Sequence, residues 1–443
     1  MSSSTISPWP MHTHPDGPSG SDRRARPVPL DVPRAPARAS VAELVFRTWV
    51  RRMPIRVKLP DGQRWGAGGP ADPVLHLARP AELFRRLGVD ANIGFGEAYQ
   101  AGDWTSPQLA DLLTAMATQL TTVVPPGLQG LRVWAQRIRG HLDSNNTAVA
   151  RRNVAAHYDL SNEMFATFLD ETMTYSSAWF DPQDSNDHGG DSLTRAQLRK
   201  IDGVLDAAGV QSGSQVLEIG TGWGALAIRA AQRGATVTSL TLSIEQQQLA
   251  QQRIREAGLE GRVTILLRDY REAVGQYDAV VSVEMIEAVG ADYWPTYFAS
   301  LDALLKPGGR IALQSITMPH ERMLISRRAY TWINKHIFPG GLIPSIQAIE
   351  ATLAEHTSLR ITQRHDHGLD YARTLRCWRQ RFLAQWQNVA DMGFDDTFRR
   401  TWEYYLAYCE AGFRTGYIDV SLIQLQRNHG APLALPPPSS PQS

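Results

Sequence analysis

Cysteine, metal-binding motifs and long apolar runs are scarce or missing in this chain. Its 443 residues include two cysteines, Cys377 and Cys409, so at most one disulfide is possible and two reduced thiols are expected. No His or Cys spacing typical of a metal site occurs. No apolar run reaches the roughly 18 residues of a membrane-spanning helix, and the N-terminus lacks the apolar core of a signal peptide. We therefore expect a cytoplasmic protein without a metal ion.

An excess of charge of one sign is missing as well. The formal net charge is +1, which gives no whole-chain argument for binding to nucleic acid. Hydrophobic residues make up 43% of the chain, which is enough for a sizeable core, and the length leaves room for two or three domains. The composition agrees with a soluble enzyme.

The chain divides unevenly along its length. Residues 1–40 are rich in Pro, Ser, Arg and His, and we expect them to be disordered, as we do the proline-rich tail 431–443. Residues 41–145 form a smaller N-terminal unit that starts with an amphipathic segment and ends near the polar stretch 144–147. Residues 1–60 hold ten Lys or Arg against four Asp or Glu. That excess is either a solvated basic tail or an attraction to anionic lipid, where each basic residue contributes about 1 kcal/mol.

The most informative stretch is residues 216–225. An apolar run from Val216 to Ile219 contains Glu218 and ends in glycines at alternate positions, Gly220, Gly222 and Gly224, before a helical pattern begins. The pattern predicts a strand, a tight turn and a helix, and the glycines let the backbone approach a ligand closely. The turn lies at the carboxyl end of a strand, where doubly wound sheets bind ligands. The spacing is neither G-x-G-x-x-G nor that of a phosphate loop.

Four further strands are predicted downstream, and helical stretches such as 244–257 separate them. The five strands are 216–219, 236–242, 262–269, 277–283 and 305–314. Strands that alternate with helices predict an α/β fold with a doubly wound, Rossmann-like parallel sheet covered on both faces. Polar or acidic residues follow successive strands, as Asp269 does.

The loop around Glu218 and Thr221 resembles the S-adenosylmethionine (SAM) loop of class I methyltransferases. The loop alone leaves open a glycine-rich turn without a ligand. The acceptors that follow successive strands favour SAM, because its ribose hydroxyls, adenine amine and methionyl ammonium are all hydrogen-bond donors.

Several unusual motifs then resemble one family in the same order along the chain. They are residues 156–165, 169–180, 282–290, 332–341 and 370–375. These motifs look like those of the cyclopropane fatty acid synthase family, which includes the mycolic acid cyclopropane synthases, and the resemblance runs from about residue 41 to 427. It implies a SAM-dependent methyltransferase catalytic domain over 146–430. The unit 41–145 resembles the extra domain of the phospholipid-modifying members and is expected to bind lipid or to mediate dimerisation.

The resemblance implies a reaction as well as a fold. Such enzymes carry the SAM methyl group to the cis double bond of an acyl chain in a membrane phospholipid, which leaves a carbocation on the other alkene carbon. In the family, loss of a methyl proton to bound bicarbonate then closes a cyclopropane ring. A membrane phospholipid substrate, peripheral attachment to the inner face of the membrane and a homodimer are implied too. Nothing indicates a nucleic-acid partner.

Residues are carried over from the family one position at a time. Tyr175 and Ser176 match positions that touch SAM, Thr241 and Gln246 match polar positions near the ribose, and Asp269 with Tyr270 matches the adenine end. The whole expected SAM set is Tyr175, Ser176, Glu218, Gly220, Thr221, Gly222, Gly224, Thr241, Gln246, Asp269 and Tyr270.

The bicarbonate site of the family is matched only in part. Glu287, Ile316 and Tyr371 occupy three of its positions. Ser177 stands where the family has Cys, and Gln314 stands where it has His. Neither replacement takes up a proton near neutral pH as His does. Glu284 replaces a small residue, usually Gly, and adds a carboxylate that serves either as the base or as a partner for the cation. Whether bicarbonate binds differently or is absent stays open.

The runs 282–290, 313–320 and 406–417 look most like the actinobacterial methyltransferases of 10-methyl-branched (tuberculostearic) fatty acid synthesis. Delayed deprotonation there allows a hydride shift, and proton loss from the methyl group then gives an exocyclic methylene. No residue pattern indicates a reductase site, so saturation of the methylene requires a separate reductase. We expect Glu284 and Gln314 to help set this outcome. The alternatives are a ring-forming synthase, a methyltransferase of a soluble small molecule, and a non-catalytic lipid-binding protein.

Overall fold

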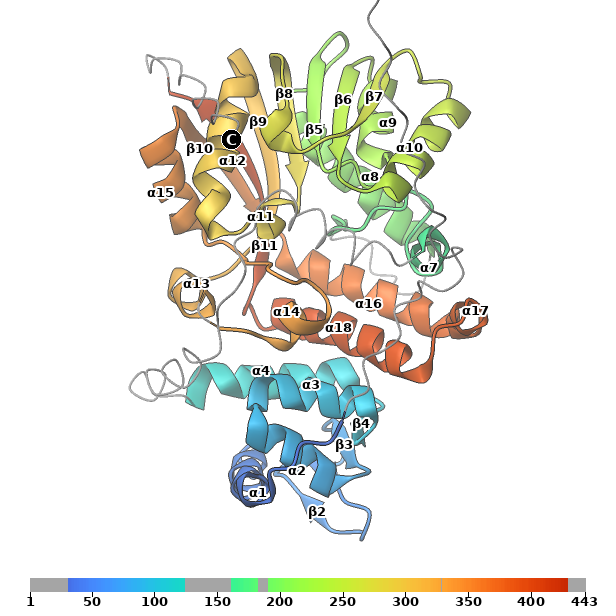
Figure 1. Cartoon of the computed structure of the whole chain (residues 1–443), viewed down its shortest axis with the longest axis vertical. Coiled ribbons are helices and arrows are strands. Elements are labelled where there is room, and N and C mark those ends of the chain that lie inside the picture. Colours follow the sequence, from blue (N-terminus) through green and yellow to red (C-terminus); the bar gives the residue numbers. More distant parts are fainter. Residues whose placement is uncertain (1–30, 124–160, 182–189, 328, 429–443) are drawn as a thin grey trace, which may run out of the picture.

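The computed structural model describes residues 31–123, 161–181, 190–327 and 329–428 (Figure 1). Most of the predicted N-terminal tail, the linker 144–147, the motif residues 156–160 and the tail 431–443 lie outside the described residues. Within them, none of the helices combines the length and apolar character needed to cross a bilayer.

A sheet of seven strands forms the larger unit, in the order β10-β11-β9-β8-β5-β6-β7. The strands are β5 (Gln215–Ile219), β6 (Thr236–Thr241), β7 (Val263–Leu267), β8 (Tyr277–Val283), β9 (Leu305–Thr317), β10 (Leu359–Asp366) and β11 (Asp419–Arg427). The five predicted strands are confirmed as β5 to β9, and they run parallel. The sheet as a whole is mixed, because β11 pairs antiparallel with both β9 and β10.

Helices cover both faces of this sheet, as predicted (Figure 1). Along β5, Val216 packs into the apolar cluster that holds residues of α8, α9 and α10, whereas the next residue, Leu217, packs into the cluster of α12 and α15. This alternation is what a strand buried on both faces requires. The bounds are α8 (Gly190–Ala207), α9 (Ala225–Gln232), α10 (Ile244–Glu256), α12 (Trp294–Leu304) and α15 (Ile346–His356).

Shorter helices connect the strands near the carboxyl edge of the sheet, and two long helices lie below it. The short ones are α7 (Asn162–Ala166), η1 (Tyr270–Glu272), α11 (Ile286–Val289), η2 (Ala291–Tyr293), α13 (His320–Ser326) and α14 (Trp332–His336). The lower layer is α16 (Gly368–Ala384), α17 (Trp386–Asp391) and α18 (Asp396–Arg414), with α16 packed on α18.

The N-terminal unit is a small α/β layer. Its sheet has the order β2-β1-β3-β4. The strands are β1 (Arg56–Lys58), β2 (Arg64–Trp65), β3 (Val74–Leu77) and β4 (Trp104–Thr105), and the helices are α1 (Pro36–Val50), α2 (Pro80–Val89), α3 (Ala91–Ala101) and α4 (Leu109–Val123). Helix α1 begins earlier than the predicted start at residue 41, at a proline whose fixed φ suits the first helical turn.

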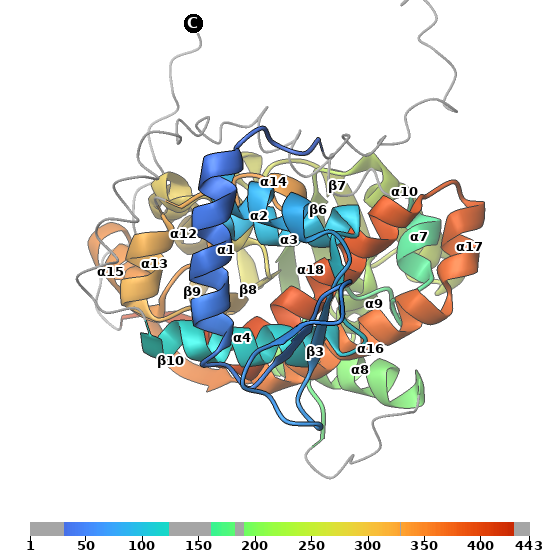
Figure 2. The same ribbon diagram turned by 90° about the horizontal axis from the view of Figure 1, so that it is seen from below.

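The two units share one apolar core. Trp104 of the N-terminal unit belongs to the same buried cluster as Trp378 of α16 and Trp402 of α18. Seen from below, α1 to α4 lie beneath α18 (Figure 2). The N-terminal unit therefore forms the floor of the larger one.

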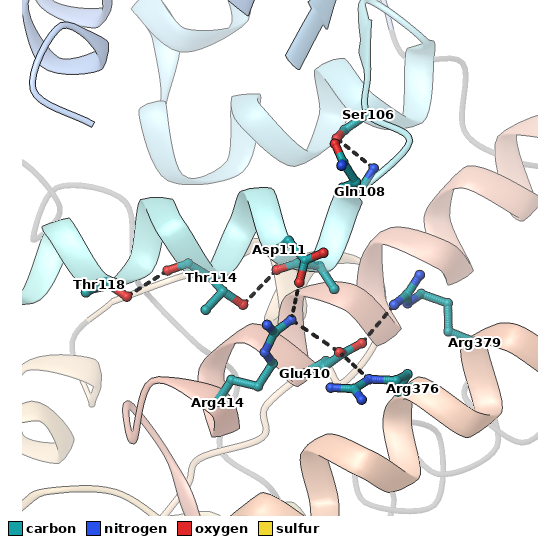
Figure 3. Close-up of polar contacts among 10 residues, drawn as sticks. Ser106, Gln108, Asp111, Thr114, Thr118, Arg376, Arg379, Glu410 and Arg414 are labelled. Carbon is teal, nitrogen blue, oxygen red and sulfur yellow. Dashed lines mark hydrogen bonds and ion pairs between the residues drawn. The ribbon is translucent and has the colours of Figure 1, made fainter. Parts of the chain in front are cut away.

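A buried carboxylate ties this floor to the long helices (Figure 3). Glu410 is 1% exposed and accepts hydrogen bonds from Arg376 at 3.2 Å and Arg379 at 2.9 Å. Arg414 lies 3.5 Å from Glu410 and donates to Asp111 of α4 at 2.7 Å. Because the pairs form one network around a desolvated carboxylate, they fix how α4 sits on α18 better than isolated surface pairs would.

The contact between α3 and α14 is tight enough to test. A Cβ added at Gly96 would lie 2.5 Å from the Trp332 ring. We expect Gly96→Ala to lower the free energy of unfolding by about 1–3 kcal/mol, because the indole must shift from its packed position. Urea denaturation followed by fluorescence measures this. Gly261→Ala, with nothing within 4 Å, is the matched control. Equal midpoints for Gly96→Ala and wild type would contradict the packing of the two units.

Candidate active site

A cavity of about 2350 Å³ runs from the carboxyl edge of the parallel strands to the N-terminal unit. Its sheet end is lined by the residues that follow four strands: Gly220 after β5, Thr241 and Leu242 at the end of β6, Asp269 after β7, and Glu284 after β8. This is the predicted place for a ligand in a doubly wound sheet.

The glycine loop is pinned between β5 and β6. The backbone N–H groups of Gly220 and Thr221 both donate to the Leu240 carbonyl at 3.0 Å. Gly220 has φ +97°, and a Cβ there would meet Met285 at 2.6 Å, so no other residue fits without a shift. Gly222 has φ +52° and nothing within 4 Å of an added Cβ, so its backbone faces open space. That space lets a ligand lie directly on the loop.

Glu218 places a buried carboxyl group next to the glycine loop. It is 4% exposed, and its Oε2 accepts a hydrogen bond from Ser239 at 2.5 Å. Burial raises the pKa of Glu218 to about 8, against the opposing effects of Ser239 and Lys200. A buried carboxylate of this kind gains from a cationic or hydrogen-bond-donating ligand, and the ammonium and hydroxyl groups of SAM fit that requirement.

The polar positions after β6 and β7 are already engaged by neighbouring side chains. Thr241 donates to the Gln246 Oε1 at 2.9 Å. Both carboxylate oxygens of Asp269 accept from the Arg271 guanidinium at 2.8 Å. Tyr270 packs edge-on against Tyr297, with ring centroids 5.2 Å apart. These side chains are therefore held in fixed positions on the cavity wall.

A buried lysine that the sequence analysis missed joins the SAM side to the catalytic side. The Lys200 Nζ donates to the Ser176 Oγ at 2.5 Å, and Lys200 is 2% exposed. Burial lowers the pKa of Lys200 to about 8, while the charges of Glu284, Asp170 and Glu218 oppose that shift. The signal was present: Lys200 and Gln197 are polar residues on the apolar face of a helical pattern, and both reach Ser176.

Tyr175 and Tyr371, two predicted site residues, stand on the side of the long helices. The Tyr175 hydroxyl pairs with that of Tyr405 of α18 at 2.8 Å. Tyr371 of α16 stacks on Phe413 with ring centroids 4.5 Å apart, which aims its hydroxyl at the end of β8.

Glu284 is the centre of a hydrogen-bond network among the residues predicted to be catalytic. Its Oε1 accepts from the Ser177 backbone N–H at 2.9 Å and from the Gln314 Nε2 at 2.8 Å, and its Oε2 accepts from the Tyr371 hydroxyl at 2.6 Å. Burial raises the pKa of Glu284, while these three donors and Lys200 favour its anion. Its φ is +52°, a left-handed conformation that costs a non-glycine residue of the order of 1–3 kcal/mol. The position suits glycine, so the carboxylate is retained at a cost in stability.

Glu287 stands beside it at the start of α11. One carboxylate oxygen accepts from the Ile316 backbone N–H at 2.6 Å and from the Ser315 hydroxyl at 2.9 Å. The other oxygen, Oε2, is buried and has no hydrogen-bond partner among the described residues. Burial, and then the charge of Glu284, raises the pKa of Glu287 to about 8. A carboxylate with a free oxygen and a raised pKa is suited to accept a proton.

The structure brings the six predicted catalytic residues together, but not all of them line the cavity. Glu284, Glu287, Ile316 and Tyr371 do, whereas Ser177 and Gln314 lie behind Glu284. The Ser177 hydroxyl donates to the Ala178 carbonyl at 2.9 Å, so the backbone N–H of Ser177 is its contribution to the site. Gly224, predicted for SAM, caps α9 instead of facing the cavity. Among the described residues, no group of His, Cys, Asp and Glu arranged to hold a metal ion is found.

Farther from Glu284 and Glu287, where the cavity enters the N-terminal unit, its lining becomes apolar and aromatic. Side chains from both units line this part: Phe95, Leu113 and Met116 from the N-terminal unit, and Trp332, Phe338 and Tyr404 from the larger one. Such a lining suits a long hydrocarbon chain, because burial of each methylene is worth about 0.8 kcal/mol.

Comparisons with known proteins agree with this geometry. The family described as mycolic acid cyclopropane synthetase matches residues 145–423. Tuberculostearic acid methyltransferase UfaA1 of Mycobacterium tuberculosis is 52% identical over 398 residues, which are 89% of this chain and 93% of that protein. Cyclopropane-fatty-acyl-phospholipid synthase of Escherichia coli is 34% identical over 364 residues, 82% of this chain and 88% of that one.

Solved structures of the larger unit are similar as well. The cyclopropane synthase MmaA2 from Mycobacterium tuberculosis has a TM-score of 0.56 and 33% identity, over 62% of this chain and 97% of its own. Mycolic acid cyclopropane synthase CmaA1, complexed with SAH and CTAB, has a TM-score of 0.57 and 31% identity, over 62% of this chain and 98% of its own. The family match, the relatives that span both units and the loop geometry agree: this chain belongs to the mycolic acid cyclopropane synthetase family and is a SAM-dependent methyltransferase.

Proposed function

We propose that this enzyme methylates the cis double bond of an oleoyl chain in a membrane phospholipid and releases a 10-methylene acyl chain. The observation that carries the proposal is the Glu284 carboxylate, fixed by three donors at the edge of the SAM pocket. The similarity to a tuberculostearic acid methyltransferase supports the same product class. The alternative product, a cyclopropane ring, is favoured by the similarity to the Escherichia coli synthase.

The first step forms one carbon–carbon bond. Bound SAM supplies the methyl group, and the residues around Glu218 and the glycine loop hold it. An alkene is a poor nucleophile, so the aromatic walls must align its π electrons with that methyl group. The bond forms at carbon 10 as the S–CH3 bond of SAM breaks; sulfur keeps that electron pair, S-adenosylhomocysteine is the leaving group, and the positive charge appears at carbon 9. Glu284 is the nearby fixed anion that stabilises this charge, and it requires no reorganisation because its three donors already hold it.

The second step moves a hydride, and the third releases a proton. A hydride shifts from carbon 10 to carbon 9, which leaves a more stable tertiary cation at carbon 10. One methyl proton then leaves, and its C–H electron pair forms the exocyclic double bond. The carboxylate of Glu287 accepts that proton, since its Oε2 has no partner among the described residues and burial raises its pKa to about 8.

The same geometry indicates whether this site needs a bound bicarbonate ion. The resemblance to the family places an anion among the residues at positions 177, 287, 314, 316 and 371. In this chain Ser177, Gln314 and Tyr371 each donate to the Glu284 carboxylate. We propose that this carboxylate takes the place of the ion, and that turnover persists in buffer purged of carbon dioxide.

Acyl-chain binding by the N-terminal unit, membrane attachment, a homodimer and a separate reductase are part of the same proposal. A cavity that continues between α3, α4 and α14 supports a role for the N-terminal unit in binding the acyl chain. Attachment to the inner face of the membrane and a homodimer follow from the family resemblance. Conversion of the methylene to a methyl branch adds two hydrogens and needs a reductant, which we assign to a separate reductase.

Proton NMR of lipids from an oleate-containing host that expresses the chain tests the product. We expect vinylidene protons from the methylene chain. Upfield cyclopropane protons would instead establish the ring-forming alternative, and unchanged lipids would favour a soluble substrate. A variant with Glu284→Gly and Gln314→His is expected to shift the product toward the ring, since φ at position 284 suits glycine. If the methylene fraction does not change in that variant, these two residues do not control the outcome.

The pH dependence of turnover tests the proton acceptor. The pKa of Glu287 is raised to about 8, so its anion is scarce at pH 6 and dominant only above pH 8. We expect kcat to rise with pH through this range. Glu287→Gln should lower kcat by about 10²-fold or more and remove the rising limb, with SAM affinity in calorimetry nearly unchanged. Glu350→Gln, an exposed glutamate of α15, is the control. Wild-type kcat in Glu287→Gln would exclude this role.

A further inference from the structure

Helix α1 is apolar on two sides. Its inner side packs against α2, where Phe46 lies 5.8 Å from Phe84 between ring centroids. Its outer side carries Val41, Leu44 and Val45, which are 63%, 68% and 61% exposed. The spacing of these three residues places them on one face of the helix. A helix that is already packed on one side and still exposes such a stripe indicates a surface that an apolar phase covers.

This stripe belongs to a set of exposed apolar side chains that line one cavity. Seven large apolar residues that are each more than a third exposed line the cavity that contains the active site. They are Val41, Leu44 and Val45 of α1, Ile325 and Tyr330 in and after α13, Tyr408 of α18, and Tyr417 before β11. Figure 2 shows α1 on the underside of the molecule, with α13 and α14 beyond it. Exposed apolar side chains of α1 and of the segment around α13 therefore line the same cavity as the active-site residues.

Basic side chains lie beside the apolar residues of α1 and beside those in and after α13. Arg38, Arg51 and Arg52 are exposed on α1 and just after it, where Glu43 is paired with Arg47. Near α13, Arg322 and Arg327 line the cavity together with the acidic Glu321, and Arg327 lies 3.9 Å from Asp292. The α1 part thus carries a net positive charge, whereas the charges near α13 balance one another. Apolar side chains beside arginines match the interface of an anionic bilayer, where each basic residue adds about 1 kcal/mol of attraction.

We propose that the outer face of α1, together with residues 322–327 and Tyr330, docks on a bilayer that contains anionic phospholipid, so that the cavity opens directly onto the lipid. This docking surface rests on the proposed function, because only a substrate in the membrane requires the cavity to face the bilayer. An acyl chain then passes from the bilayer into the apolar cavity without crossing water. The apolar side chains enter the interface, and the arginines contact lipid phosphates.

Co-sedimentation of the full chain with vesicles of dioleoyl phosphatidylglycerol tests the surface. We expect a variant with Leu44→Asp and Val45→Asp to bind these vesicles at least tenfold more weakly than wild type. Its SAM affinity and melting temperature should stay at the wild-type values, because both positions are exposed and far from the glycine loop. Wild-type binding should also weaken in phosphatidylcholine vesicles and at high salt, since the attraction is partly electrostatic.

Matched controls separate docking from a general effect of added charge. Val274→Asp and Leu369→Asp replace residues that are 70% and 72% exposed but do not line the cavity, and they should bind vesicles as wild type does. Methyl transfer by the wild-type enzyme to detergent-dispersed lipid reads out the proposed function separately. Wild-type vesicle binding by the double variant would overturn the proposal. So would loss of a dimer in that variant with vesicle binding intact, which would assign the stripe to a second copy of the chain.

Discussion

Two carboxylates held close together in a desolvated site are the constraint on which the rest of this structure depends. Burial raises the pKa of both Glu284 and Glu287, and the charge of Glu284 raises that of Glu287 further. Their environments differ: three donors and Lys200 favour the anion of Glu284 against the effect of burial, whereas Glu287 keeps one oxygen without a partner among the described residues. Such a difference between neighbouring acids is how one site both stabilises a cation and accepts a proton.

Burial of Glu284 and Glu287 lowers the stability of the folded chain, and contacts with the surrounding elements offset this loss. Glu284 sits at φ +52°, where glycine would be unstrained. The loop that contains Ser177, the strand β9 and the long helix α16 each supply one donor to Glu284, so these three segments must be correctly placed around the end of β8. Lys200, a residue of α8, supplies a positive charge that opposes the negative charge of the nearby carboxylates. The core shared with the N-terminal unit keeps α16 and α18 in place and completes the apolar part of the cavity.

The sequence predicted β5 to β9 because their apolar alternation and glycine-containing turns are local signals. It missed β10, whose residues after Leu359 are mostly exposed and polar, and β11, which follows the last recognised motif. Lys200 and Gln197 on the apolar face of α8 were a local signal for buried polar contacts, but their partner Ser176 lies in another segment and is identified only by the structure. The backbone N–H of Ser177, not its side chain, contacts Glu284, and a pattern of side chains does not reveal that.

The proposed reaction depends on the lifetime of the cation beside Glu284, and the position of deuterium in the product reports that lifetime. The substrate is a phospholipid whose oleoyl chains carry deuterium on carbons 9 and 10. If the cation persists until a hydride shifts and the proton then passes to Glu287, the methylene product carries both deuterium atoms on carbon 9 and none on carbon 10. A ring product with one deuterium on each carbon, or a methylene product that has lost deuterium to solvent, would contradict the account.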